Sequence, residues 1–176
     1  GFVGKPVLPL DAPEVSAAIE RVQKRTDALL NCGGTHRPEW FHRKLGDILY
    51  EGCGVARDEA GLLDALTKVR ELREEFWRDV KVVGTGNRLN QELEKAGRVA
   101  DFIELGEVMI LDALDRRESA GAHFRNEYAT EAGEAKRNDG DWCAVSAWET
   151  RPDGTKVRHS EPLSFSLIDL QVRDYR

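Results

Sequence analysis

The residues best suited to chemistry lie where a long helical pattern ends, in the run Glu118-Ser119-Ala120-Gly121-Ala122-His123-Phe124-Arg125. Small residues in such a run permit close approach of the backbone, and His123 and Arg125 can pair with carboxylates across an interface. No nucleophile–base pair, phosphate loop or metal-ligand set accompanies them in the sequence. We therefore predict no catalytic, cofactor-binding or metal-binding residue in this chain.

A second candidate is Glu39-Trp40-Phe41-His42, which has the Glu-x-x-His spacing of di-iron carboxylate bundles. Those sites need a second Glu-x-x-His and two further inward glutamates, and the sequence has no second copy. Trp40 and Phe41 form the apolar face here, so we expect Glu39 and His42 to face outward. The glycines in Gly84-Thr85-Gly86 are expected to form a turn, since they lack the strand–loop–helix context of a dinucleotide site.

Composition bounds the remaining function classes. The chain has 176 residues, 33% of them charged, and a net charge of −6, which argues against a general nucleic-acid binder. No apolar run approaches the roughly 20 residues needed to cross a bilayer, and the N-terminus does not resemble a signal peptide. Because the sequence begins without Met, we expect a processed or excised segment. Cys32, Cys53 and Cys143 lack CxxC spacing, so a reduced intracellular chain is expected.

A long helix from Asn87 to Glu118 is the element that must position the His123 region. It would measure about 45–50 Å at roughly 1.5 Å per residue. Glu107 is the one polar position that interrupts its apolar stripe. The stripe consists of Leu89, Leu93, Ala96, Ala100, Ile103, Ile110 and Leu114. A helix of this length needs partner helices along its apolar side.

Three shorter helices precede it. Asp11 is expected to cap the first, with Pro13 in its first turn, and Pro38 opens the second. Asp58 is expected to cap the third, whose outward residues are Arg70, Arg73, Glu74 and Glu75. Its apolar face is Leu62, Leu66, Val69, Leu72 and Phe76. We expect the third and fourth helices to form an antiparallel pair that the first helix completes as a three-helix bundle.

The C-terminal part has a different pattern. Two strands, Trp142–Glu149 and Lys156–Phe165, flank the turn Arg151–Gly154, and an extended tail begins at Ile168. A lone hairpin is marginal in water, so it should pack on the bundle or on another domain. The predicted fold class is all-α, a three-helix bundle (spectrin-repeat-like) with a small C-terminal β-hairpin. The predicted domains are a bundle over residues 1–128 and a loop plus hairpin over residues 129–176.

Residues 118–128 match the motif E-S-R-G-A-H-x-R-x-[DE]-[YF], apart from Ala120 in place of the motif's Arg. The segments 41–48 and 51–57 are similar to two further motifs of the same family, R-K-x-L-G-x-x-M and C-G-V-x-R. Residues 163–165 and 173–175 are similar to the C-terminal end of soluble-type members of that family. Over nearly its whole length the chain resembles the C-terminal helical domain of the flavoprotein subunit of succinate dehydrogenase and fumarate reductase.

The resemblance implies a parent subunit that is an FAD-dependent oxidoreductase, which interconverts succinate and fumarate and passes electrons to an iron–sulfur subunit. The FAD and dicarboxylate residues of the family precede this region, so the chain alone should be inactive and bind no FAD. Its implied partners are the flavin-binding domain and the iron–sulfur subunit, without nucleic acid or a membrane span. The implied location is the bacterial cytoplasm, peripheral to the membrane through partner subunits. Arg57, His123 and Arg125 are the polar positions expected at an interface.

Two other interpretations stay open on the sequence. L-aspartate oxidase has a closely similar domain with a related E-S-R-G-x-H motif, and the Gly121-Ala122-His123 form and the polar tail favour the dehydrogenase over it. The chain could also be an independent helical interaction module without an oxidoreductase parent.

Overall fold

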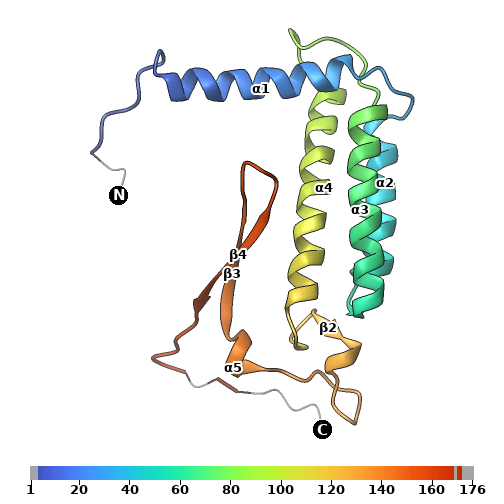
Figure 1. The fold of residues 1–176 in the computed structure, drawn as a ribbon, viewed down its shortest axis with the longest axis vertical. Coiled ribbons are helices and arrows are strands. Elements are labelled where there is room, and N and C mark those ends of the chain that lie inside the picture. Colours follow the sequence, from blue (N-terminus) through green and yellow to red (C-terminus); the bar gives the residue numbers. More distant parts are fainter. Residues whose placement is uncertain (1–3, 169, 172–176) are drawn as a thin grey trace. The chain divides into compact units, whose positions relative to one another are not determined.

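The computed structural model describes residues 4–168 and 170–171 (Figure 1). They form two compact units. The first unit contains the residues up to Glu51 and Ala65–Glu107, and the second contains Gly52–Asp64 and the residues from Val108 onward. The helices α3 (Glu59–Asp79) and α4 (Gln91–Asp115) supply residues to both units. The predicted domain division after residue 128 does not coincide with these units and stays a prediction.

Three helices form the core of the first unit: α2 (Pro38–Gly52), α3 and α4 (Figure 1). The rings of Phe41 on α2 and Phe76 on α3 meet edge to face, with centroids 5.2 Å apart. Gly106 on α4 lies so close to α2 that a Cβ there would be 3.3 Å from Leu45 Cδ1. The all-α bundle predicted from the sequence is confirmed.

The face predicted for α3 is buried at all five positions, which confirms its register: Leu62, Leu66, Val69, Leu72 and Phe76. The predicted cap is also present, since Gly61 N–H donates to Asp58 Oδ1 at 2.8 Å. On α4, Ala96, Ala100, Ile103 and Ile110 are buried. The interior pattern therefore follows the helical spacing of the sequence.

The ends of α4 differ from the prediction. The helix runs from Gln91 to Asp115 rather than from Asn87 to Glu118, because Asn90 caps it: Leu93 N–H donates to Asn90 Oδ1 at 3.1 Å. Leu89 precedes this cap and is 94% exposed, so placing it on the buried stripe was wrong.

Helix α1 (Pro13–Asn31) does not complete the bundle, contrary to the prediction. Only Leu29 is buried, while Ile19 and Val22 are 62% and 67% exposed. Its N-cap residue is Ala12, with no side-chain hydrogen bond, so the Asp11 cap was also wrong. The third helix of the bundle is α2, because its aromatic and leucine side chains fill the space beside α3 and α4.

A buried carboxylate joins α3 and α4. Glu107, the polar position in the stripe, is 3% exposed. Its oxygens accept hydrogen bonds from Arg70 Nε at 2.7 Å and Arg73 Nη1 at 2.5 Å. Arg70 and Arg73 therefore do not simply face outward as predicted, because their guanidinium groups neutralise this acid.

The connection before α2 is tied to the end of α3. Gly34 N–H donates to Val80 O at 3.2 Å, and Lys81 N–H donates to His36 O at 2.8 Å. A Cβ at Gly34 would lie 1.9 Å from Asp79 O, so the backbones meet here only because position 34 is glycine. His36 Nδ1 also lies 2.5 Å from Asp79 Oδ2.

The predicted hairpin is confirmed in the second unit. Strands β3 (Ala144–Thr150) and β4 (Lys156–Pro162) pair antiparallel, with Ala144 opposite Pro162 and Thr150 opposite Lys156. A short helix that was not predicted, α5 (Asp139–Trp142), precedes them, so the first strand does not begin at Trp142 as predicted. The second strand ends at Pro162 rather than at Phe165. The hairpin packs on the end of α4, where Trp148 Nε1 donates to Asp112 Oδ1 at 2.8 Å. Most of the predicted extended tail lies outside the described residues.

Candidate functional site

The three residues predicted for an interface come together in the second unit. Strand β1 (Ala56–Arg57) pairs in parallel with β2 (Phe124–Arg125), and the register sets Arg57 opposite Arg125. His123 directly precedes β2. Two-residue strands carry no alternating pattern, so nothing in the sequence signalled this pairing.

Arg125 closes the C-terminal end of α4 and is only 2% exposed. Its Nη1 donates to Ala113 O at 2.7 Å and to Leu114 O at 3.3 Å. Carbonyl groups in the last turn of a helix have no partner within the helix, so the guanidinium satisfies them. Its Nε donates to Glu127 Oε2 at 3.1 Å. The Nε and Nη1 groups of Arg125 are thus engaged inside the second unit.

Ser119 fixes the backbone of Arg125. The buried hydroxyl accepts from Arg125 N–H at 2.8 Å and donates to Arg125 O at 3.1 Å. Between them the chain turns sharply, since Ala120 N–H donates to His123 O at 2.8 Å and His123 N–H donates to Ala120 O at 3.0 Å. Gly121 occupies this turn with a φ of 58°, which favours glycine.

Glu118 is a buried acid with every oxygen engaged. Its Oε1 accepts from Arg116 Nε at 2.8 Å and Nη2 at 2.6 Å, and Oε2 accepts from Asn138 N–H at 2.8 Å. The side chain of Glu118 is 2% exposed. Sequence reasoning did not assign roles to Arg116 and Glu118, although their opposite charges two positions apart were a usable signal.

His123 is held as a neutral imidazole. Its Nε2 lies 3.1 Å from Arg116 O, so Nε2–H donates and Nδ1 remains an acceptor. Burial lowers the pKa of His123, and the charges of Arg57, Arg116 and Arg125 lower it further, against the opposing effect of the bond to Arg116 O. A proton on Nδ1 is therefore disfavoured near neutral pH.

Arg57 is anchored by neutral acceptors. Its Nε donates to Gly54 O at 2.7 Å, its Nη2 to Ala122 O at 3.3 Å and its Nη1 to Cys53 Sγ at 3.7 Å. Burial raises the pKa of Cys53, and the opposing charge of Arg57 does not cancel that effect, so the thiol is protonated at neutral pH. Within the described part of the chain, no carboxylate pairs with Arg57.

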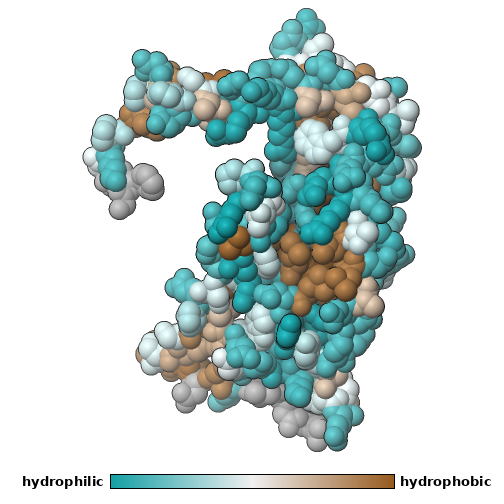
Figure 2. All heavy atoms as spheres, viewed as in Figure 1, coloured by the Kyte–Doolittle hydropathy of each residue, from teal (hydrophilic) through white to brown (hydrophobic). Residues whose placement is uncertain are grey.

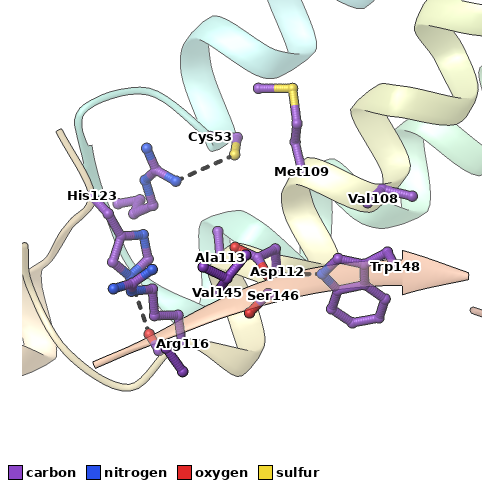
Figure 3. A pocket seen from close by; sticks show the side chains of 12 residues that line it. Cys53, Val108, Met109, Asp112, Ala113, Arg116, His123, Val145, Ser146 and Trp148 are labelled. Atoms are coloured by element: carbon purple, nitrogen blue, oxygen red, sulfur yellow. Dashed lines mark hydrogen bonds between the residues drawn. The ribbon is translucent and has the colours of Figure 1, made fainter. Parts of the chain in front are cut away.

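Arg57 and His123 line one cavity of about 510 Å³ in the second unit (Figure 3). Side chains from the end of α4 and from β3 complete its wall: Val108, Met109, Asp112, Ala113, Arg116, Ala144, Val145, Ser146 and Trp148. A cavity with a few polar groups and an apolar wall is suited to binding a ligand.

The other candidates from the sequence do not form a site. Glu39 pairs with Lys95, and the exposed His42 lies beside Phe102, with ring centroids 5.7 Å apart. Both face outward as predicted. In the ranges that the structure describes, no group of three or more His, Cys, Asp or Glu side chains is arranged to hold a metal ion.

The loop around Gly84 does not fit the flavin cofactor of the resembling family. Asn90 fills it, since its Nδ2 donates to Val83 O at 3.0 Å and Thr85 O at 3.2 Å. A Cβ at Gly84 would lie 2.7 Å from that nitrogen. Asn90 thus occupies the space that a pyrophosphate would need at Gly84, so this loop does not fit the phosphates of FAD.

The fold and the site together define a helical domain whose polar motif stabilises a helix end. The family described as "Fumarate reductase flavoprotein C-term" matches residues 42–175, and the chain belongs to it. The resemblance predicted from the sequence is thereby confirmed, and the alternatives of an L-aspartate oxidase domain and an independent module are not favoured.

Individual relatives agree with the family. The succinate dehydrogenase flavoprotein subunit of Bacillus subtilis is 26% identical over 160 residues, which cover 90% of this chain and 26% of that protein. The fumarate reductase flavoprotein subunit of Haemophilus influenzae is 28% identical over 114 residues, 65% of this chain and 19% of that protein. The chain therefore spans about a quarter or less of these relatives' lengths.

Solved structures show the same fold. A variant of FrdA from E. coli quinol fumarate reductase superposes with a TM-score of 0.75 at 25% identity, covering 89% of this chain and 26% of that one. In the part of the chain that the structure describes, no helix is both long and apolar enough to span a membrane.

Proposed function

We propose that this chain is the C-terminal helical part of the flavoprotein subunit of an FAD-dependent succinate dehydrogenase or fumarate reductase. The observation that carries the proposal is the family match over residues 42–175. In that role the chain holds neither FAD nor the dicarboxylate. It supports the flavin-binding domain, which performs the interconversion of succinate and fumarate.

An exposed apolar stripe on α4 supports a partner surface. Phe102 and Leu105, both in the first unit, are 42% and 55% exposed and lie three residues apart on the helix. Figure 2 shows a hydrophobic area over α4. Exposed apolar area of this kind marks a surface that another protein covers. We assign it to the flavin-binding domain of the same subunit.

The iron–sulfur subunit is the second proposed partner. Arg57, His123 and Arg125 remain the proposed interface positions, with Arg125 acting through the backbone it holds rather than by direct contact, since it is buried. We place the parent subunit in the bacterial cytoplasm, peripheral to the membrane through its partner subunits.

Two preparations test the proposal. The source polypeptide that carries this chain should contain FAD and reduce an artificial dye when succinate is added. Residues 1–176 expressed alone should be colourless and inactive in the same assay. Bound flavin or succinate-dependent activity in the short preparation would contradict the assignment, and so would a source polypeptide without flavin.

A further inference from the structure

We propose that the cavity beside Arg57 and His123 binds a carboxylate group carried on a short apolar stem. The carboxylate is supplied by a free organic acid or by an acidic side chain of a second polypeptide. The site itself stands independently of the proposed function.

The charge of Arg57 is the first argument. A guanidinium has five N–H groups, and neutral atoms of Gly54, Cys53 and Ala122 accept from three of them. One N–H therefore remains on each terminal nitrogen, and these two groups can donate to the oxygens of a carboxylate. Because the anchored nitrogens already fix the guanidinium, binding would order few additional side-chain torsions.

The other ionisable side chains around the cavity have partners of their own. Arg116 is paired with Glu118 at 2.6 Å, and Asp112 accepts from Trp148 Nε1 at 2.8 Å. His123 is neutral and presents an acceptor at Nδ1. Arg57 is thus the one lining cation for which the described residues supply no acid. A half-buried cation without a counter-ion favours an anionic ligand.

The apolar part of the wall defines the rest of the ligand. Val108, Met109, Ala113 and Val145 contribute side chains without charge or hydrogen-bonding groups (Figure 3). A hydrophobic wall with one precisely placed charged group is the usual form of a small-ligand site. An acid with a short alkyl chain matches this lining better than an inorganic anion does.

Butyrate is the probe, and neutral butyramide is its matched control. NMR of the source polypeptide that carries this chain, with the side-chain Nε–H of arginine and the histidine ring nuclei observed, should show saturable shifts at Arg57 and His123 with butyrate. Butyramide should produce none. Equal shifts with both compounds, or no saturable shift with butyrate, would overturn the proposal.

Three variants localise the effect. Arg57→Gln should weaken butyrate binding at least tenfold, whereas Arg117→Gln, which alters an exposed neighbouring arginine, should leave it unchanged. Val145→Glu keeps Arg57 and adds a carboxylate at a half-exposed lining position, so it should also abolish butyrate binding. A folded variant of either kind that retains butyrate binding would rule out this cavity. Two variants are used so that one remains informative if the other folds poorly.

A second arm identifies the source of the carboxylate. If it belongs to another polypeptide, the dissociation constant of the isolated iron–sulfur subunit should rise at least tenfold in saturating butyrate, and Arg57→Gln should produce the same rise without butyrate. If it is a free acid, subunit association should not respond to butyrate. This arm depends on the proposed function, whereas the butyrate titration does not, so the two can fail separately.

Discussion

The polar side chains between Glu118 and Arg125 form hydrogen bonds with main-chain atoms of nearby segments of this chain. Glu118 binds the backbone of Asn138, Ser119 binds the backbone of Arg125, and Arg125 binds the last carbonyls of α4. A run that looks like a set of reactive groups in the sequence is therefore a structure that ends a helix and starts a strand. The sequence could indicate which residues were unusual, but not that their partners would be main-chain atoms.

The contribution of the Ser119 hydroxyl to stability can be tested by replacing Ser119 with alanine. Ser119→Ala leaves the buried N–H of Arg125 without its acceptor, which should cost about 1–3 kcal/mol of unfolding free energy. Ser164→Ala, at an exposed position, is the control and should change stability little. Urea unfolding measures both, and equal midpoints for the two variants would show that the Ser119 bonds do not stabilise the fold.

Two glycines should respond to alanine in opposite directions. At Gly34 the added Cβ would meet the Asp79 carbonyl at 1.9 Å, so Gly34→Ala should destabilise the chain by about 1–3 kcal/mol. Gly46 lies inside α2 with open space around it, so Gly46→Ala should stabilise by up to about 1 kcal/mol. Thermal unfolding of the pair checks the close approach, and a stabilising Gly34→Ala would show that the contact is absent.

Elements were predictable where their own periodicity defines them. The buried face of α3 and the middle of α4 follow helical spacing, and the hairpin follows its turn. Partners were harder to predict, because spacing shows which side of a helix is apolar and not which helix covers it. For this reason the sequence did not show that α2, and not α1, completes the bundle. Likewise, β1 and β2 are too short to carry any pattern.

The register of the bundle is tested by cavity-forming substitutions. Ile103 and Leu72 are 1% and 3% exposed, so replacing either with Ala should cost about 2–5 kcal/mol. Leu105→Ala removes similar volume from a position that is 55% exposed and should cost far less. Losses at Ile103 and Leu72 no larger than at Leu105 would mean that the register is wrong.

The ion pairs between α3 and α4 should make stability depend on pH. Burial alone would raise the pKa of Glu107, but the hydrogen bond from Arg70 and the charges of Arg73 and Arg70 outweigh it and lower that pKa. The contribution of Glu107 to the free energy of unfolding is therefore fully present above the ordinary carboxyl pKa of about 4.3. That contribution is lost as the pH falls through the lowered pKa of Glu107.

Substitution of Glu107 separates this effect from general acid unfolding. Glu107→Gln should lose about 1–3 kcal/mol at neutral pH and show a shallower decline in stability between neutral and acidic pH. Glu94→Gln removes an exposed pair with Arg98 and should lose under about 1 kcal/mol. Parallel stability–pH curves for wild type and Glu107→Gln would exclude the buried acid as the cause.

At the scale of the whole molecule, the role that we propose for the chain is that of a folded support for the flavin-binding domain. It belongs to a family defined by the C-terminal part of a flavoprotein, and it spans 26% of the Bacillus subtilis relative. The described residues supply a helical bundle, a cavity lined by Arg57 and His123, and exposed apolar side chains on α4. The sequence was sufficient to predict this family, because the motif at residues 118–128 and the other similar segments occur in the family's order over most of the chain.

Locating the flavin within the source polypeptide tests this account most directly. The polypeptide is isolated with its flavin, digested with a protease under native conditions, and its fragments are separated and identified by mass and visible absorption. We expect all of the flavin in fragments outside residues 1–176, and colourless fragments from within them. Flavin retained by a fragment from residues 1–176 would contradict the account.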